Sequence, residues 1–496
     1  MGYISLNAYS AVIRAPEWKG LYQSGDAYAN DPRYAVEERN ALTRDGFLRP
    51  VAKCELYAPE LPAPIETFAK LYRRWHTGDA GHDVLIAASG GQLYWMPPEG
   101  TEWTRMALPP DWEGDGYQSN VWSYVAYEMN PEGSDAPVDV LLLSNAKDGM
   151  ICVRGDCMTA SVVNTPKKFG VIARHAERIW GGAIENDPDM LVYSAPFDPF
   201  DWTQNDEIPE DGAGDLKQPS WDGDSFTALT AFGDQLLALK RTRIWRILGT
   251  NPGEYVFSEQ YGGGAPYART IAVDGARILM LGARGIVQYN GESVEPYQQA
   301  YAKGIFERMN QSALRGAAAC VWRDVYYCAL PLDKSESNNA VLMFNTREGT
   351  WLLREDVSVE TFLPTETDLY FTSATTPGKI WRWREDCGVD GEAQPMRWVS
   401  PWFDLSYKNM TKGGFTVYLT IECERAVTLN VSIQTEKKTK VKTVTFMPPA
   451  SGRMAKQRRL TFGGNGRRFR FMLESEGTEP WRLTGGIQIE AETDSD

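Results

Sequence analysis

The chain of 496 residues carries 51 Lys and Arg against 66 Asp and Glu, and 43% of its residues are hydrophobic, which is typical of a soluble globular protein. Its formal net charge of -15 argues against a general polyanion binder, because phosphate-binding surfaces need an excess of cations. The chain lacks the roughly 18 consecutive apolar residues of a membrane span, and its start lacks the pattern of a signal peptide. Seven scattered cysteines without a C-x-x-C pair predict reduced thiols and folding in a cytoplasm.

Short runs rich in Val, Ile, Leu and aromatic residues, separated by Gly, Asp and Asn, recur along the chain, whereas helical periodicity is hard to find. Seven of these runs can be aligned at intervals of about 41 to 57 residues, and they begin at Val84, Val138, Ile179, Leu236, Ile278, Val325 and Leu369. Another strand precedes each run across a tight turn, and a second apolar strand follows it. The four-stranded blades of β-propellers have this order and period.

The sequence therefore predicts an all-β protein, with a six- or seven-bladed β-propeller over residues 65–385 followed by a C-terminal β-sandwich over residues 396–491. We expect residues 1–64 to form an N-terminal arm, in which residues 45–58 (DGFLRPVAKCELYA) are a candidate closing strand for the last blade. Residues 386–395 indicate a linker, and residues 492–496 a disordered tail. Irregular sandwiches with similar spacing are the alternative to the propeller.

The chain has three histidines, His76, His82 and His175, and none lies near a nucleophile motif, so we expect no catalytic residue, no enzymatic activity and no cofactor. His76 and His82, with Asp79 and Asp83, could complete a metal site, but their spacing matches no established zinc pattern. We interpret this stretch as a solvated loop and predict no metal site. His175 is expected at a hairpin turn.

The run ACVWRDVYYCA predicts a hairpin with a two-residue turn at Arg323 and Asp324. That turn would pair Cys320 with Tyr327, so the sulfurs of Cys320 and Cys328 would point to opposite faces. We interpret both as core thiols. The run FNTREGTWLLRE lacks the Ser and Asp of the S-x-D-x-G-x-T-W turn found in glycan-cleaving propellers, so we interpret it as two strands joined by a turn, with Trp351 packed inside.

An acidic insertion, residues 198–224, separates the third and fourth predicted blades. Clustered carboxylates could hold Ca²⁺, but the spacing fits no EF-hand. We predict an exposed loop that either decorates the surface or contacts a neighbouring subunit. Its candidate residues are Asp198, Asp201, Asp206, Glu207, Asp211, Asp215, Asp222 and Asp224.

Positive charge is concentrated near the C-terminus, where residues 397–482 hold 16 Lys and Arg against 7 Asp and Glu. The strongest signal is the run GRMAKQRRLTFGGNGRRFRF, a candidate protein-contact face whose members are Arg453, Lys456, Arg458, Arg459, Arg467, Arg468 and Arg470. Such a run could contact an acidic partner surface or nucleic acid, and a solvated strand face with a basic bias is the alternative. An acidic body and a basic end on one chain suggest head-to-tail complementarity between subunits.

Residues 193–206 (YSAPFDPFDWTQND), 238–257 (ALKRTRIWRILGTNPGEYVF), 281–291 (LGARGIVQYNG) and 325–353 resemble blade strands of the tail nozzle and packaged-DNA stabilisation proteins of short-tailed bacteriophages. The leader DPRYAVEERNALTRDGFLRP is similar to the segment with which many of them begin the propeller. The resemblance covers roughly residues 30 to 385, and the sandwich resembles phage virion modules more loosely. These motifs mark strands and turns, so no catalytic residue follows from them.

The resemblance implies a structural virion protein that forms a homo-oligomeric ring, commonly of six copies, below the portal and adaptor. Such a ring closes the head, retains the packaged DNA and forms its exit channel. Its implied partners are other copies of itself, portal, adaptor and other tail proteins, and the passing genomic DNA without sequence specificity. No membrane insertion and no small-molecule substrate are expected. We expect an acidic lumen and a basic run that contacts another protein chain.

Two other classes stay open from the sequence. A glycan-binding or glycan-cleaving propeller for host attachment would show a central pocket with paired carboxylates and aromatic residues. A cellular interaction scaffold would show blades more alike than these and would not need the sandwich.

Overall fold

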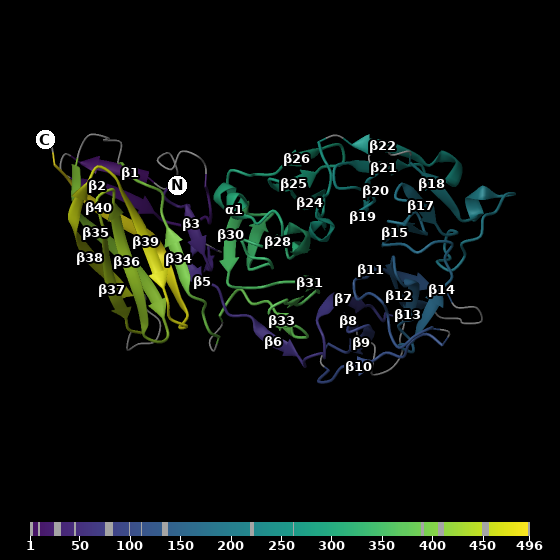
Figure 1. Ribbon diagram of the computed structural model, residues 1–496. Coiled ribbons are helices and arrows are strands. Elements are labelled where there is room, and N and C mark those ends of the chain that lie inside the picture. Colours follow the sequence, from purple (N-terminus) through teal and green to yellow (C-terminus); the bar gives the residue numbers. More distant parts are fainter. Residues whose placement is uncertain are drawn as a thin grey trace.

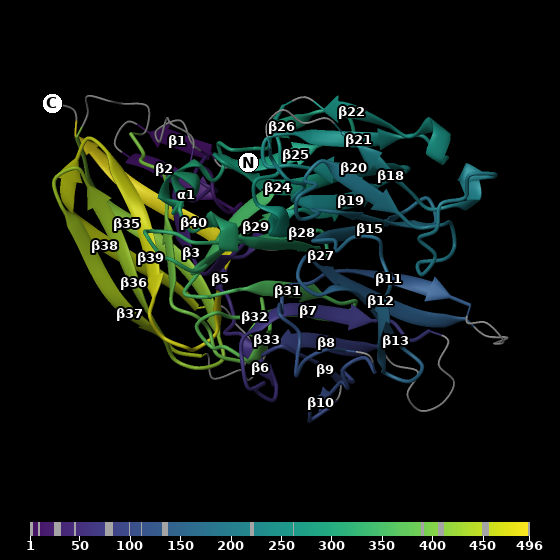
Figure 2. The same cartoon turned by 45° about the vertical axis from the view of Figure 1, so that its right-hand side comes forward.

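The structure is a computed structural model that describes residues 3–7, 10–23, 31–43, 46–74, 83–98, 100–110, 112–130, 137–218, 223–260, 262–387, 391–404, 411–448 and 456–494. The described chain is nearly all-β (Figure 1). Seven four-stranded antiparallel sheets lie around a common centre, and two five-stranded sheets stack beside them (Figures 1 and 2). We refer to these two parts as the ring and the sandwich. The all-β prediction is confirmed.

Each of the first four sheets of the ring is built from strands that follow one another along the chain. The first contains β7 (Ile65–Leu71), β8 (Val84–Ser89), β9 (Gln92–Met96) and β10 (Thr104–Arg105). The second contains β11 (Ser123–Met129), β12 (Val138–Asn145), β13 (Gly149–Arg154) and β14 (Ala160–Val163). The third contains β15 (Val171–His175), β16 (Arg178–Gly182), β17 (Met190–Tyr193) and β18 (Gly214–Lys217). The fourth contains β19 (Ala228–Phe232), β20 (Gln235–Leu239), β21 (Ile244–Leu248) and β22 (Val256–Gln260).

The last three sheets follow the same plan until the final strand. The fifth contains β23 (Ala272–Asp274), β24 (Arg277–Gly282), β25 (Gly285–Tyr289) and β26 (Val294–Pro296). The sixth contains β27 (Ala318–Trp322), β28 (Val325–Leu330), β29 (Ala340–Asn345) and β30 (Thr350–Glu355). The seventh contains β31 (Thr361–Pro364), β32 (Leu369–Thr372) and β33 (Ile380–Arg382), and its fourth strand is β6 (Glu55–Ala58) from near the N-terminus.

The strand β6 closes the ring at the place where the sequence predicted a closing strand. Leu56 pairs with Trp381, and Ala58 with Ile380. The fourth position of the last sheet is therefore filled from the other end of the chain, so that β33 has a partner on both sides.

Clusters of buried apolar side chains join consecutive sheets in a closed circle. Leu71 of the first sheet shares a cluster with Leu141 of the second, for example, and Leu363 of the seventh shares one with Phe68 of the first. The intervening sheets are joined in the same way. Because each sheet has a neighbour on both faces, every residue of β8, β12 and β28 is buried. This explains why the aligned runs are continuously apolar.

Two five-stranded sheets form the sandwich, and most of their strands come from the C-terminal quarter of the chain. One has the order β1-β2-β40-β35-β38 and the other β3-β34-β39-β36-β37. The C-terminal strands are β34 (Met396–Val399), β35 (Thr411–Cys423), β36 (Val427–Thr435), β37 (Thr439–Phe446), β38 (Lys456–Gly466), β39 (Phe469–Ser475) and β40 (Trp481–Asp494). Strand β36 alternates between buried and more accessible residues, as period-two patterning predicts.

The N-terminal arm differs from the prediction, because three of its six described strands complete the sandwich. Strand β2 (Ser10–Ala15) pairs with both β1 (Tyr3–Asn7) and β40, and β3 (Glu37–Arg39) pairs with β34. Two short strands, β4 (Ala41–Leu42) and β5 (Arg49–Pro50), pair with each other. At the other end of the chain, residues 492–494, which we predicted to be disordered, extend β40 beside β35. One outer strand of each C-terminal sheet, β40 or β34, gains an N-terminal partner in this way, which the local sequence does not reveal.

The ring and the sandwich share a core. One cluster contains Leu281 and Tyr326 of the ring together with Trp398, Val417 and Phe471 of the sandwich. The described part of the predicted linker is held as well, since the Ala393 amide donates to Thr478 and the Gln394 amide donates to Val51.

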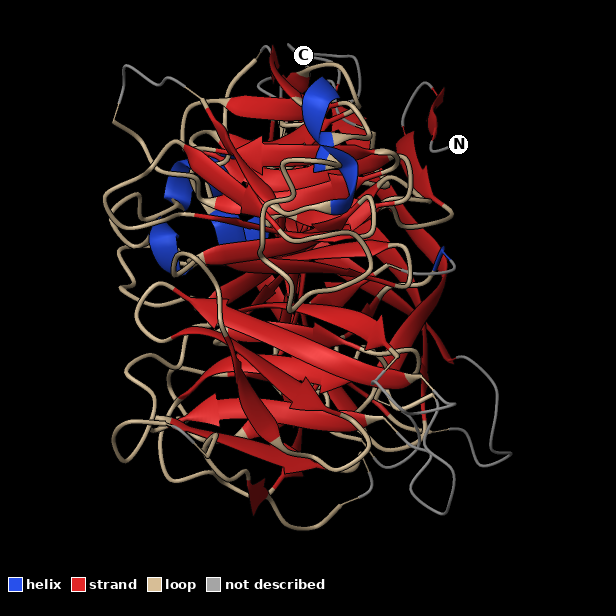
Figure 3. Cartoon of the chain, turned by 90° about the vertical axis from the view of Figure 1, so that its right-hand side faces the viewer, coloured by secondary structure: helices blue, strands red, loops and turns tan. Residues whose placement is uncertain are grey.

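The helices whose bounds lie in the described ranges are few and short. They are α1 (Lys303–Arg308), η2 (Pro209–Asp211), η3 (Pro252–Glu254), η4 (Ala268–Thr270) and η5 (Leu314–Gly316). Figure 3, which views the ring from its far end, shows strands throughout and helices only as isolated turns. None of the helices in the described ranges is long and apolar enough to cross a membrane.

Candidate protein-contact site

The predicted basic face divides between the edge of the sandwich and the outer face of one of its sheets. Arg458 and Arg459 lie on β38, the outermost strand of its sheet, and Arg467 and Arg468 lie at the turn that follows. Lys456 begins β38, but its side chain, like the whole of Arg453, lies outside the described residues. The sequence prediction therefore identified one side of a charged edge.

Arg470 differs from the other members because it is engaged within the fold. Its Nε donates to Gln434 Oε1 at 2.7 Å, its Nη1 lies 3.3 Å from Glu37 Oε1, and its guanidinium stacks on Trp402 at 5.0 Å. These contacts join β39 to β3 and to the segment after β34. We therefore assign Arg470 a structural role and remove it from the contact face.

The other side of this edge is formed by β37, which the sequence analysis did not single out. β37 is the outermost strand of the second sheet, and its first five residues are exposed. Lys442 lies over the ring of Phe462 on β38 at 5.5 Å, so the two edge strands stack on each other. We call the resulting surface the basic edge, and it comprises Lys437, Lys438, Lys440, Lys442, Arg458 and Arg459. The signal in the sequence was the run EKKTKVK.

The lysines of the basic edge differ from Arg397, Arg425 and Arg482 of the sandwich, each of which forms an ion pair with a carboxylate. Among the described residues, Lys437, Lys438, Lys440 and Lys442 form no ion pair, whereas Arg482 pairs with Glu422. Glu436 is the nearest acid along the chain. Burial alone would raise its pKa, but the backbone amides of its own segment and of Arg467 and Arg468, together with the charge of the neighbouring Lys437, lower it. That carboxylate is therefore occupied by the turn.

The acidic insertion has an ordered fold of its own and includes the strand β18, so it is not simply a loop. Asp215 lies on β18, and Asp211 ends the short helix η2. The carboxylates of Asp198 and Asp201 each accept a hydrogen bond from the backbone amide two residues later. Turns of this kind are built by the short Asp side chain itself. Asp222 lies outside the described residues.

Asp224 is a correction to the predicted acidic loop. We expected it to be exposed, but it is only 7% exposed. Its carboxylate accepts hydrogen bonds from the backbone amide and the Nε of Arg241, at 3.1 and 2.7 Å. It fixes the turn between β20 and β21, and so its role is structural.

A buried guanidinium holds the insertion in place. Arg178, on β16, is 3% exposed, and its Nη1 donates to the carbonyls of Ser194 and Gly212 at 2.7 and 2.6 Å. Its Nη2 donates to the carbonyl of Glu210. Hydrogen bonds from a charged donor to buried carbonyls are among the stronger ones in proteins. The insertion therefore presents its carboxylates from a fixed backbone.

We call the outer end of this region the acidic tip. Helix η2 contacts η3, which brings two stretches of exposed carboxylates together. The tip comprises Asp206, Glu207, Glu210, Asp211 and Glu254. Two large apolar side chains lie within it or beside it, Ile208 with 51% and Val256 with 54% of its surface exposed. Within the described residues, none of the five acids forms an ion pair.

Of the metal site considered from the sequence, only Asp83 lies in the described ranges. No group of three or more His, Cys, Asp or Glu residues in those ranges could hold a metal ion. Asp83 pairs with Lys70 at 2.5 Å, whereas Asp79, His76 and His82 lie outside the described residues. Burial lowers the pKa of His175, whose position at the end of β15 agrees with the predicted hairpin.

The hairpin of the sixth sheet matches its prediction. Cys320 pairs with Tyr327, and the turn residues Arg323 and Asp324 have φ angles of 49° and 62°. Cys320 and Cys328 lie in different core clusters, so their sulfurs do point to opposite faces. Burial raises the pKa of Cys328 to about 12. A thiol with such a pKa is a poor nucleophile at neutral pH.

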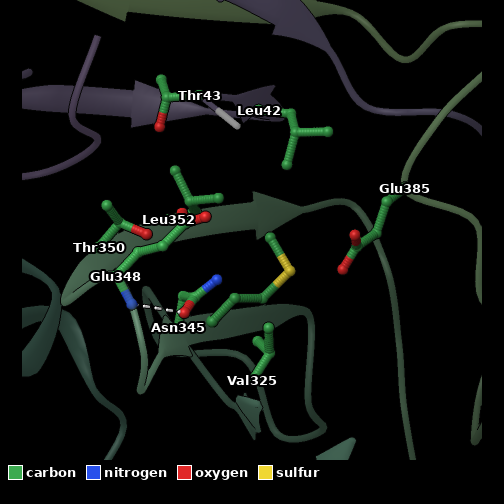
Figure 4. A pocket seen from close by; sticks show the side chains of 9 residues that line it. Leu42, Thr43, Val325, Asn345, Glu348, Thr350, Leu352 and Glu385 are labelled. Carbon is green, nitrogen blue, oxygen red and sulfur yellow. Dashed lines mark hydrogen bonds between the residues drawn. The ribbon is translucent and has the colours of Figure 1, made fainter. Parts of the chain in front are cut away.

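Trp351 is fully buried at the start of β30, as predicted for the run FNTREGTWLLRE. A small pocket lies nearby, lined by Leu42, Thr43, Val325, Met343, Asn345, Glu348, Thr350, Leu352 and Glu385 (Figure 4). Its volume is about 20 Å³, which suffices for about one water molecule. The pocket is therefore too small for a ligand.

A larger cleft of about 280 Å³ lies where β7, β11 and β15 end and β12 begins, and it contains the carboxylates of Glu128 and Asp139. Arg74 Nη2 binds both, at 3.2 and 2.6 Å, and the Arg74 amide donates to Asp139 as well. Paired carboxylates could serve as acid and base in glycan cleavage. One guanidinium binds both carboxylates, so the pair forms an ion-pair network.

No family model and no curated protein matches the chain. Similar solved structures include the computationally designed Ika8 protein, with 8% identity over 67% of this chain and 100% of that chain and a TM-score of 0.38. BBS1N in complex with ARL6DN has 8% identity over 67% of this chain and 96% of that chain, with a TM-score of 0.42. The exo-beta-1,3-galactanase from Phanerochaete chrysosporium has 9% identity over 75% and 96%, with a TM-score of 0.24. Likenesses at this level carry no argument about function.

Proposed function

We propose that this protein is a structural component of a short-tailed bacteriophage particle. In this proposal, copies of the chain assemble into an oligomeric ring below the portal and adaptor, which closes the head, retains the packaged DNA and forms its exit channel. The seven sheets are then the blades of a seven-bladed β-propeller. The closed circle of core clusters and the closing strand β6 support the blade assignment.

The observation that carries the proposal is the separation of unpaired charge along the molecule. The basic edge lies at the outer side of the sandwich, and the acidic tip lies at the opposite end of the ring (Figures 1 and 2). Where charges serve only to keep a protein in solution, positive and negative side chains can be interspersed on the surface, and many of them form ion pairs within the chain. Segregated and unpaired charges of opposite sign favour a protein that is completed by neighbours.

The charge balance also fits a DNA conduit. Outside residues 397–482 the chain holds 35 Lys and Arg against 59 Asp and Glu. An acidic lumen would repel the phosphate backbone and let DNA slide, whereas a cationic lumen would hold it. In the assembled ring, the acidic body then faces the DNA path and the basic edge faces protein.

Peptide mass spectrometry of density-purified phage particles from a producing culture tests the proposal. We expect the protein in the particles, at about half the copy number of the portal subunit, as the resemblance to nozzle rings implies. Absence from purified particles would overturn the proposal. Binding of the isolated chain on a glycan array would then direct attention to host attachment.

A further inference from the structure

We propose that the basic edge of one copy docks on the acidic tip of a second copy of this chain, in a head-to-tail contact. This inference rests on the proposed function, because it names the two surfaces by which the ring would be built. A contact between two different patches is heterologous, so its repetition gives a closed ring or an open filament.

The basic edge has the features of a contact surface. Strands β37 and β38 are both outermost in their sheets and stack on each other, so the edge offers two strands at one side of the sandwich. Val441 is 57% exposed on β37, and Met447 is 52% exposed just after it. Exposed apolar side chains among unpaired cations are typical of interfaces, because the apolar part gains from burial and the charges select the partner.

The acidic tip provides the complementary features. Glu207, Glu210 and Glu254 are exposed just before η2, on η2 and on η3, without an ion-pair partner in the described chain. Ile208 and Val256 add exposed apolar surface of a size comparable to that of Val441 and Met447. Carboxylates around apolar side chains on one surface thus match lysines around apolar side chains on the other.

The tip is also preorganised for docking. Besides the three backbone carbonyls held by Arg178, Asn205 Oδ1 accepts hydrogen bonds from the amides of Glu207 and Ile208 at 3.1 and 3.0 Å. A surface that is already ordered loses little conformational entropy when it binds. A flexible acidic loop would instead have to be ordered by the contact.

The two surfaces lie at opposite ends of the long direction of the molecule, so one copy cannot join them within itself (Figures 1 and 2). Nucleic acid would satisfy the lysines, but it would leave Val441 and Met447 exposed and would be repelled by the tip. A second copy satisfies both surfaces at once. We therefore assign the basic edge to the acidic tip of the next copy.

Two charge-reversal variants test this pairing. The edge variant carries Lys437→Glu, Lys438→Glu, Lys440→Glu and Lys442→Glu, and the tip variant carries Glu207→Lys, Glu210→Lys, Asp211→Lys and Glu254→Lys. We expect neither variant to associate with itself in sedimentation velocity at low ionic strength. Mixing them should restore association, because the unchanged tip of the first meets the unchanged edge of the second. Restored association also shows that both variants are folded.

The wild-type chain and a control complete the experiment. Wild-type association should fall with added salt, as the Debye length shrinks from about 10 Å at 0.1 M to about 3 Å at 1 M. A control variant with Glu102→Lys, Glu113→Lys, Glu292→Lys and Glu336→Lys changes the net charge by as much as the tip variant does, but at exposed sites elsewhere in the ring. This control should still associate with itself. Carbodiimide cross-linking of isotopically light and heavy copies should join lysines of the edge to carboxylates of the tip.

Several outcomes would overturn the inference. They are a wild-type chain that stays monomeric and cross-links only within itself, a single variant that associates like the wild type, and a mixture that stays monomeric. Loss of DNA binding by the edge variant with unchanged self-association would assign the edge to nucleic acid. None of these outcomes changes whether the protein is recovered from phage particles, so the proposed function would stand. If the protein were absent from particles but mixing still restored association, the proposed function alone would be overturned.

Discussion

The ring and the sandwich use β-sheets in two different ways. In the ring each sheet is covered on both faces by its neighbours, and β8, β12 and β28 are buried along their whole length. In the sandwich each sheet has one buried face and one more open face, so that β36 alternates and β37 is exposed over most of its length. The sandwich strands are also longer, reaching 14 residues in β40.

This difference accounts for the separation of charge. The ring can expose polar residues mainly at its turns, and turns favour Asp, Asn and Gly because these residues form local hydrogen bonds or adopt positive φ. The sandwich exposes strand faces, where Asp is disfavoured and Lys, Arg and Thr are tolerated. The acidic ring and the basic sandwich thus follow from their architectures. The clustering of unpaired charges at the basic edge and at the acidic tip does not, and it calls for a functional explanation.

The largest expected effect comes from a substitution in the core that the ring and the sandwich share. Trp351 is fully buried, its ring lies 4.7 Å from that of Phe344, and its carbonyl accepts a hydrogen bond from the Leu21 amide. Replacing it with Ala should lower the free energy of unfolding by about 3–5 kcal/mol, because it leaves a large cavity. Chemical denaturation followed by fluorescence measures this loss. The control Trp95→Ala, at a half-buried position in the first sheet, should lower the free energy of unfolding by clearly less. An equal decrease in the two variants would contradict a shared core.

A second test concerns the buried charge within the ring. Arg178→Met would leave the carbonyls of Ser194, Glu210 and Gly212 without their donor, so we expect a loss of about 3 kcal/mol in the free energy of unfolding. Hydrogen exchange should show faster exchange at residues 205–213. A matched substitution at the exposed Arg315 should change little. Unchanged exchange in the variant would show that the insertion is held by other contacts.

A third test uses pH at the boundary between the two parts. Burial raises the pKa of Glu38 well above its ordinary value, and among the described residues neither carboxylate oxygen has a hydrogen-bond partner. The folded state therefore binds more protons than the unfolded state between the unfolded pKa, near 4.5, and the higher folded pKa. Stability from this group is complete below that range and is lost as the pH rises through it.

Glu38→Gln removes this titration, so the profile of stability against pH should become flatter above about pH 4.5, and the variant should be more stable than the wild type at neutral pH. Thermal unfolding across a pH series measures both effects. Glu102→Gln, at an exposed position, serves as the control. A variant with an unchanged slope would show that the Glu38 carboxylate is solvated in the folded protein.

The smallest expected effect concerns the turns of the ring. Asp324 has a φ of 62° and Gly275, in the corresponding hairpin of the fifth sheet, has a φ of 51°. Asp324→Gly should stabilise the protein by about 0.4–1 kcal/mol, and Gly275→Ala should destabilise it by a similar amount, because only Gly adopts positive φ without strain. Urea denaturation resolves the opposite signs. Shifts in the same direction would mean that backbone strain is not the deciding factor at these turns.

Much of the ring was predictable because its signals are local. The runs beginning at Val84, Val138 and Val325 are the strands β8, β12 and β28 with the predicted starts. The pairing of Cys320 with Tyr327 followed from a two-residue turn, which fixes register without reference to the rest of the chain. A candidate closing strand could be placed within residues 45–58, because the last sheet lacked a fourth strand.

The candidate site was predictable only in part. The basic run placed Arg458 and Arg459 on the contact edge, but Lys440 and Lys442 joined them only when β37 stacked on β38. Arg470 and Asp224 looked like their exposed neighbours in the sequence, but both are bound by side chains from other segments of the chain. Charge in a sequence does not reveal which side chains find partners, because those partners come from distant segments.

The sequence by itself determined the all-β class, the repeating order of strands and turns, and the concentration of positive charge near the C-terminus, since composition and short-range periodicity carry these properties. Only the tertiary structure decided that β2 pairs with β40 and β3 with β34, that the ring and the sandwich share a core, and that unpaired charges gather at the two ends. Residues such as Ile13 and Ile489 meet across almost the whole chain. A pairing at that separation leaves no local pattern, because it is selected by the burial and hydrogen bonding of the complete fold.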